Sequence, residues 1–136
     1  MNSCDAKAKR LGINGLTDVE RIVVLVNRVN FEVEMRGLTM FFYNSAGDHA
    51  VETVSALEAV GAQGAADALR AANALFPGGA PSADRTERFD GWQMLTKTQL
   101  LDPLDDQFYA GKPDVFDRLC TYIELNAPRL QEYPSA

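Results

Sequence analysis

Apolar residues recur at helical spacing near the start of the chain. From Val19 to Val33 they follow one another at steps of three and four, which predicts an amphipathic helix. Thr17-Asp18-Val19-Glu20 has the form of a capping box, in which the threonine and glutamate side chains each bond the other residue's backbone amide. We therefore expect the helix to start at Thr17 and to stop at Gly37, a residue type that commonly ends helices.

One part of this predicted helix also has a strand-like pattern. Residues 29–35 alternate apolar and polar side chains and are rich in β-branched residues, as a half-buried strand would be. The longer periodicity of three and four residues and the capping signal favour a helix.

Two more helices are predicted as a pair. Residues 48–60 and residues 62–76 each carry one apolar side, and only Gly61 separates them. Such a short break makes consecutive helices neighbours, so we expect an αα-hairpin over about residues 48–76. Pro77-Gly78-Gly79 is a strong stop signal after it.

The pattern is weaker in the next third of the chain. Residues 77–91, PGGAPSADRTERFDG, form the most loop-like internal segment, and residues 92–101 contain large apolar groups whose helical phase is unclear. Asp102 and Pro103 fit the N-cap and the first position of a short helix that runs to about Tyr109.

A final helix is predicted from Pro113, with its apolar residues on one side and with Pro128 and Pro134 ending it. The chain of 136 residues suits one domain with one core. We expect an all-α, single-domain bundle of about five to seven helices over residues 16–130. A flexible arm (1–15) and a tail (131–136) would flank it.

The apolar segments are short. The run Ile22 to Val26 is far below the roughly 20 residues that a membrane span needs, and the N-terminal residues lack the apolar stretch of a signal peptide. Cys4 and Cys120 are too far apart for a disulfide framework or a metal-ligand spacing. We therefore expect a cytoplasmic protein that does not bind membranes.

His49 is the first candidate for a catalyst, because imidazole titrates near neutral pH. Ser45 and Asp48 lie too close to it in sequence to form a nucleophile, base and acid that converge in space. We interpret Ser45 as a helix N-cap and Asp48 as a first-turn carboxylate. An alternative is a small hydrolase or transferase that uses His49 with Glu32 or Glu34.

No other catalytic or cofactor motif is present. The sequence has one histidine, no cysteine cluster, no glycine-rich phosphate loop and no EF-hand spacing. We expect no enzyme activity, no cofactor and no metal. Cys120 is interpreted as a core residue.

The charge distribution gives a different hypothesis. The net charge is −6, with seven acids against three basic residues from Asp102 onward and four acids with no basic residue between Ala46 and Leu69. Clustered lysine and arginine are absent, which argues against direct binding to nucleic acid. The sequence favours a protein partner with a basic surface, and the candidate partner-binding residues are Asp102, Asp105, Asp106, Asp114, Asp117, Glu52, Glu58 and Asp67.

A combination of short motifs carries a family resemblance over about residues 24–127. They are an acid at Glu32 or Glu34, a glycine before an aromatic pair, the turn N-S-x-G-D, the hairpin motif A-L-x-x-x-G-A and a terminal Y-I-x-x-N. In this chain the motif residues treated as structural are Gly37, Phe41, Phe42, Asn44, Ser45, Gly47, Asp48 and Gly61. With these marks the sequence resembles a bacterial domain-of-unknown-function family that includes a DNA-mimic protein.

The resemblance implies an all-helical fold and, for some members, homodimers. It also implies a non-catalytic protein that uses an acidic helical surface to occupy a DNA-binding protein, such as a helix-turn-helix transcription factor. A related alternative is an immunity-type inhibitor of a basic nuclease. A structural subunit that covers its apolar surface with a second copy is a further alternative.

Overall fold

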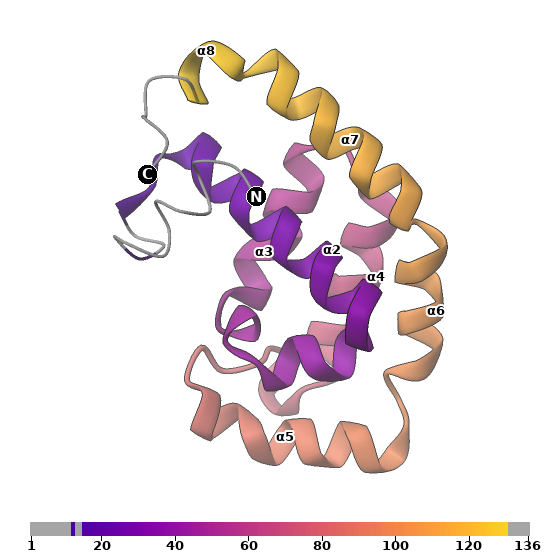
Figure 1. The fold of residues 1–136 in the computed structure, drawn as a ribbon. Helices are drawn as coiled ribbons and strands as arrows, with labels where there is room; N and C mark the ends of the chain where they lie inside the picture. Colours follow the sequence, from indigo (N-terminus) through magenta and orange to yellow (C-terminus); the bar gives the residue numbers. More distant parts are fainter. Residues whose placement is uncertain (1–11, 13–14, 131–136) are drawn as a thin grey trace.

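The computed structural model describes residue 12 and residues 15–130, which form an all-α fold with no strand in those ranges (Figure 1). This confirms the predicted fold class. The predicted tail and almost all of the predicted arm lie outside the described residues. The helices are α2 (Asp18–Tyr43), α3 (Ala50–Ala59), α4 (Gln63–Ala74), α5 (Arg85–Thr98), α6 (Asp102–Ala110), α7 (Lys112–Leu125) and α8 (Ala127–Leu130), with 3-10 turns η2 (Ser45–His49) and η3 (Pro77–Gly79).

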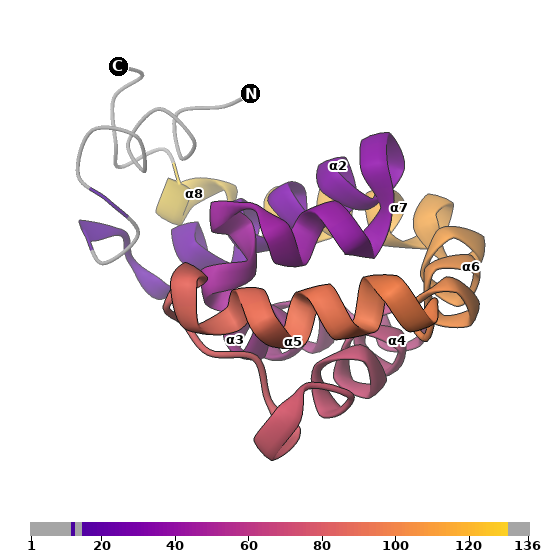
Figure 2. The ribbon, with the colours of Figure 1, turned by 90° about the horizontal axis from the view of Figure 1, so that it is seen from below.

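Helix α2 is the centre of the fold and contacts α3, α5, α6, α7 and α8 (Figures 1 and 2). Its valines form the core stripe that the sequence predicts, with Val23, Val26 and Val29 all fully buried. The capping box is present, since the Thr17 hydroxyl accepts from the Glu20 amide at 3.3 Å and the Glu20 carboxylate accepts from the Thr17 amide at 2.8 Å. Residues 29–35 are helical, as predicted.

Gly37 divides α2 into two segments. Its φ of 79° and ψ of 175° are not helical, so the predicted stop is real, but a second helical segment, Leu38 to Tyr43, follows directly. The Asp105 carboxylate accepts the Leu38 amide at 2.7 Å. A Cβ on residue 37 would lie only 2.5 Å from Asp105 Oδ2, so the glycine permits both the kink and the approach of α6.

The segment after the kink packs inward. Phe41 and Phe42 are each 1% exposed, and the Phe42 ring lies 4.9 Å from that of Phe76 between ring centroids. Gly47 lies against this segment, because a Cβ there would be 2.8 Å from the Phe41 carbonyl oxygen. These contacts fix the angle at which α2 meets the helices that follow.

The prediction of Ser45 as an N-cap is wrong. Ser45 is the first residue of the turn η2, and Asn44 precedes it as the N-cap without a side-chain capping bond. The Asp48 carboxylate accepts from Arg88 Nη2 at 2.9 Å, so an arginine that lies 40 positions away in the sequence binds it, in addition to any effect of the helix dipole.

Helices α3 and α4 form the predicted hairpin, and Gly61 between them has a φ of 87°. Leu57 and Leu69 are fully buried, and so are several alanines of α4. The small alanine side chains let α4 approach α3 and also α6, with which it is in contact.

The prediction of a loop over residues 77–91 is wrong in its second half. Helix α5 starts at Arg85, where the Asp84 side chain accepts the Glu87 amide at 3.1 Å. Its buried residues are Arg88, Gly91 and Leu95. Because two of these three buried residues are an arginine and a glycine, the segment lacks the apolar periodicity by which a helix is predicted from sequence.

The predicted ends of the last helices need small corrections. Leu101 is the N-cap of α6, and Asp102 is its first residue. Helix α7 starts at Lys112 and ends at Leu125, before Pro128, which lies inside the short helix α8. Pro134 lies outside the described residues.

Candidate partner-binding surface

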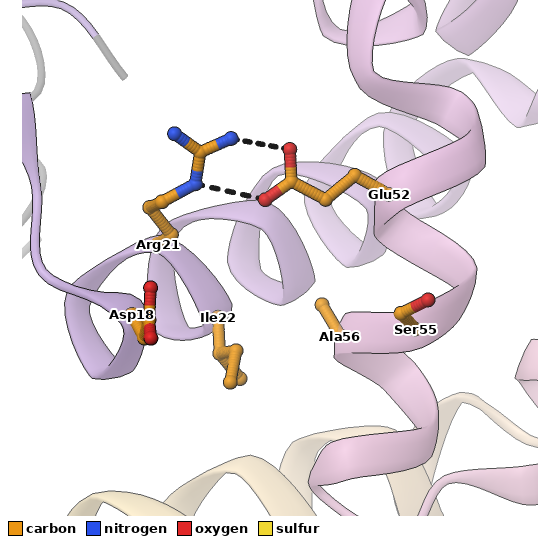
Figure 3. A pocket seen from close by; sticks show the side chains of 6 residues that line it. All are labelled: Asp18, Arg21, Ile22, Glu52, Ser55 and Ala56. Carbon is orange, nitrogen blue, oxygen red and sulfur yellow. Dashed lines mark hydrogen bonds and ion pairs between the residues drawn. The ribbon is translucent and has the colours of Figure 1, made fainter. Parts of the chain in front are cut away.

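Glu52, on α3, is neutralised by an arginine of α2. Arg21 Nε donates to one oxygen of the Glu52 carboxylate at 2.8 Å, and Nη2 contacts the other oxygen (Figure 3). These hydrogen bonds lower the pKa of Glu52 and raise that of Arg21. The shallow pocket beside them, lined also by Asp18, Ile22, Ser55 and Ala56, therefore carries a balanced ion pair.

Two of the hairpin acids share one arginine, so both are ion-paired but only one of their two charges is balanced. Arg70 on α4 contacts Asp67 Oδ1 through Nη1 at 2.7 Å and the Glu58 carboxylate through Nη2. Gln63 Nε2 also donates to Asp67, at 2.8 Å, and this bond is the first cause of the lowered pKa of Asp67. The basic residue that pairs with both acids lies just beyond the segment that reads as purely acidic in the sequence.

The acids of α7 differ from one another. Asp114 is exposed and accepts from Arg118 Nε at 3.1 Å, one helical turn further on. Asp117 is also exposed, and it takes part in no ion pair within the part of the chain that the structure describes.

Helix α6 is the strongest concentration of unpaired acid. It contains three aspartates and no basic residue, and Asp102 and Asp106 are exposed without an ion pair among the described residues. Asp105 is half-buried on the Leu38 amide. Burial raises the pKa of Asp105 first, the Leu38 amide opposes this, and the charges of Asp102 and Asp106 add to the rise.

A shallow groove of about 220 Å³ runs between α6 and the kink of α2. Its walls combine acids with one exposed arginine, Arg36, and with exposed apolar groups, since Met35 is 62% exposed and Tyr109 is 54% exposed. The lining residues are Val33, Glu34, Met35, Arg36, Gly37, Asp105, Asp106 and Tyr109. We call α6 together with this groove the α6 acidic face.

The eight candidate acids thus fall into three groups. Glu52, Glu58, Asp67 and Asp114 are ion-paired with three arginines, whereas Asp105 is bonded to the backbone of α2. The three acids that remain exposed and unpaired among the described residues are Asp102, Asp106 and Asp117.

His49 lies at the end of η2 and is half-buried. Burial lowers its pKa, so the neutral imidazole is favoured. The two carboxylates nearest to it in sequence, Asp48 and Glu52, are bonded to Arg88 and Arg21. Neither is thus available without loss of an ion pair to orient the imidazole for general base catalysis.

Sequence reasoning missed Arg88, the most deeply buried charged side chain of α5, at 2% exposure. Its Nε donates to the Phe42 carbonyl at 2.7 Å, and Nη1 donates to the Ser82 carbonyl at 2.7 Å. Nη2 donates to the Asn44 carbonyl at 3.1 Å and to Asp48 at 2.9 Å. The one feature of the sequence that indicates a buried cation here is Asp48, an acid in a turn that directly follows an aromatic run.

Two findings bear on the class of this protein. No helix of the described ranges is long and apolar enough to cross a bilayer. The fold and the surface define a small all-α protein in which α6 presents two exposed aspartates, and α7 one, that form no ion pair among the described residues.

The chain belongs to the DMP19-like protein family, whose model matches residues 14–126. This agrees with the resemblance that the sequence motifs indicate. No curated protein and no solved structure matches the chain.

Proposed function

We propose that this protein is a non-catalytic binding module that uses the α6 acidic face to engage a basic surface of a partner protein, namely the DNA-contacting surface of a DNA-binding protein. The observation that carries the proposal is the contrast between α6 and the acids of the α3–α4 hairpin. The hairpin acids have arginine partners, whereas Asp102 and Asp106 are exposed and unpaired among the described residues.

The charges of α6 have the spacing that a basic DNA-reading surface can use. Asp102 and Asp106 are four residues apart, which is one turn and about 6 Å along a helix axis. Phosphates of one DNA strand advance about 3.4 Å per step along the duplex axis, so the axial separation of the two aspartates is of the same order as that of nearby phosphates. Unpaired charge of this kind attracts a cationic partner through complementary potentials.

Apolar groups beside the acids favour a protein partner over free cations. Met35 and Tyr109 flank Asp106 in the groove and are both more than half exposed. Exposed apolar side chains next to charge are typical of protein interfaces, whose centres are apolar and whose rims are polar. Family membership supports the same class of function.

The test is an affinity capture with the full chain as bait, followed by identification of the retained proteins and competition with duplex DNA. We expect a basic DNA-binding protein that is retained at about 50 mM salt, released at about 300 mM salt and displaced by the DNA. Asp102→Asn/Asp106→Asn should abolish capture. The matched control Glu58→Gln/Asp67→Asn, which removes two acids that are ion-paired with Arg70, should retain it.

Two results would refute the proposal. One is a partner whose binding is indifferent to salt and to the α6 double variant. The other is a partner that the hairpin control loses and the α6 variant keeps, since that would place the interface on α3 and α4.

A further inference from the structure

A second groove lies on another part of the molecule, between α3, α4 and the turn after α4. It has a volume of about 340 Å³, which is at the lower end of the range for small-ligand sites. Val51 and Val54 of α3 and Ala74 of α4 are its apolar lining residues, and Gly79 and Ala80 also line it. Val51, the second residue of α3, is 57% exposed, so its side chain is accessible to a ligand in this groove.

One buried polar group in this groove lacks a hydrogen-bond partner. Asn73 lines the groove, is only 6% exposed, and donates from Nδ2 to the Ala50 carbonyl at 3.2 Å. Its Oδ1 accepts no hydrogen bond within the described part of the chain. Because a carbonyl can only accept, the Asn73 atom bonded to Ala50 must be the donor nitrogen. The atom of Asn73 that lacks a partner is therefore the acceptor oxygen.

The charges of the groove neutralise one another. Arg70 and Glu58 both line it and form an ion pair, and Arg70 also binds Asp67. A charged ligand would have to break one of these pairs. A neutral ligand with a hydrogen-bond donor satisfies Asn73 and leaves the pairs intact.

We propose that this groove binds a neutral peptide-like amide that carries an apolar side chain. The ligand's N–H donates to Asn73 Oδ1, and its side chain packs on Val51 and Val54. The hydroxyl of Ser55, an exposed residue that also lines the groove, is available to donate to the ligand's carbonyl. The site lies on α3 and α4 and is independent of the proposed binding by the α6 acidic face.

Access to Asn73 requires a small movement, because Oδ1 is covered in the structure. Gly79 of the turn η3 lines the same groove, and this turn is able to change conformation. Gly78 and Gly79 are both exposed, have φ values of 82° and 88°, and have no heavy atom within 4 Å of the position of a Cβ. Two consecutive glycines in open space change conformation without steric cost.

The test uses N-acetyl-L-leucine N-methylamide as the probe and the analogue in which oxygen replaces both N–H groups as the matched control. Binding is followed by two-dimensional amide NMR of the full chain. We expect the amide probe to shift the signals of Val51, Ser55, Ala80 and the Asn73 side-chain amide. A dissociation constant on the order of 1 mM is expected for a ligand of this size.

The oxygen analogue should bind at least about fivefold more weakly, because it cannot donate to Asn73. Asn73→Leu should abolish the difference between the two probes. Since Asn73→Leu could also disturb the core, the exposed Val51→Glu serves as a second variant and should weaken the amide probe to a similar degree. Equal binding of both probes, shifts elsewhere on the fold, or a structural water on Oδ1 with no response to the probe would each overturn the proposal.

Discussion

Replacement of Arg88 by methionine is predicted to be among the most destabilising single changes in this protein. Methionine keeps most of the volume and the apolar stem but removes the guanidinium. That group makes four hydrogen bonds at 2.7–3.1 Å, three of them to backbone carbonyls and one to Asp48. The arginine side chain is fully buried in its ion pair, whereas that of Asp48 is 35% exposed.

The magnitude follows from what is left without a partner. Loss of the guanidinium leaves the carbonyls of Phe42, Asn44 and Ser82 without this donor, and water must reach Asp48 to replace the cation. Removing one partner from a buried charged network costs about 3–5 kcal/mol. For a domain of this size that corresponds to a fall in Tm of roughly 10–20 °C.

The assay is urea unfolding followed by far-UV circular dichroism and by the fluorescence of Trp92, the only tryptophan of the chain. The matched control is Arg70→Met, in which an arginine with two acidic partners is lost from a side chain that is 50% exposed. We expect that control to cost less than about 1 kcal/mol. If Arg88→Met were within about 1 kcal/mol of the wild type, the hydrogen-bond reasoning would be refuted.

Three further predictions concern the kink and the titratable groups. Gly37→Ala should destabilise the fold by about 2 kcal/mol or more in urea unfolding, because its Cβ meets Asp105 and its φ is positive; a neutral effect would show that the kink relaxes freely. The pKa of Asp105 is raised in the folded state, so its contribution to stability is present below its ordinary value of 3.8 and is lost as the pH rises through the folded value. In Asp105→Asn the free energy of unfolding should no longer fall as the pH rises through that value. Asp105→Ala also loses the acceptor for the Leu38 amide and should be less stable than Asp105→Asn. An alanine variant that is more stable than the asparagine variant would contradict this assignment. The pKa of His49 is shifted in the opposite direction, so its contribution to stability is present above the ordinary pKa of 6.5 and is lost as the pH falls through the lowered value. His49→Gln should remove this pH-dependent loss of stability and leave partner capture intact. Loss of capture in this variant would instead indicate a direct role for the imidazole.

The sequence is sufficient for the parts of the fold that depend on local signals. The capping box at Thr17, the apolar stripe of α2 and the glycine at position 61 each act within a few residues, so their structural outcome can be predicted from the pattern. The sequence predicts a stop at Gly37, but the helix continues to Tyr43, and the Leu38 amide at the start of this continuation donates to Asp105, which lies 67 positions after Leu38. No local signal predicts that bond.

The candidate site shows the same limit. In the sequence Glu58 and Asp67 lie in a segment without basic residues, yet Arg70, three residues past Asp67, forms ion pairs with both. Glu52 is neutralised by Arg21, which comes from another helix. A count of charges in sequence windows measures neither pairing, so the sequence predicted eight candidate acids where the structure leaves three exposed and unpaired among the described residues.

The contact between Asp105 and the Leu38 amide has a consequence for the energetics of recognition. It pins the middle of α6 to the central helix, so the aspartates on either side of it are held on a stiff element rather than on a mobile loop. A visiting protein then meets carboxylates whose positions are already set, and little conformational entropy is lost when the complex forms. A modest number of charges, held still, can for this reason discriminate between cationic surfaces of different geometry.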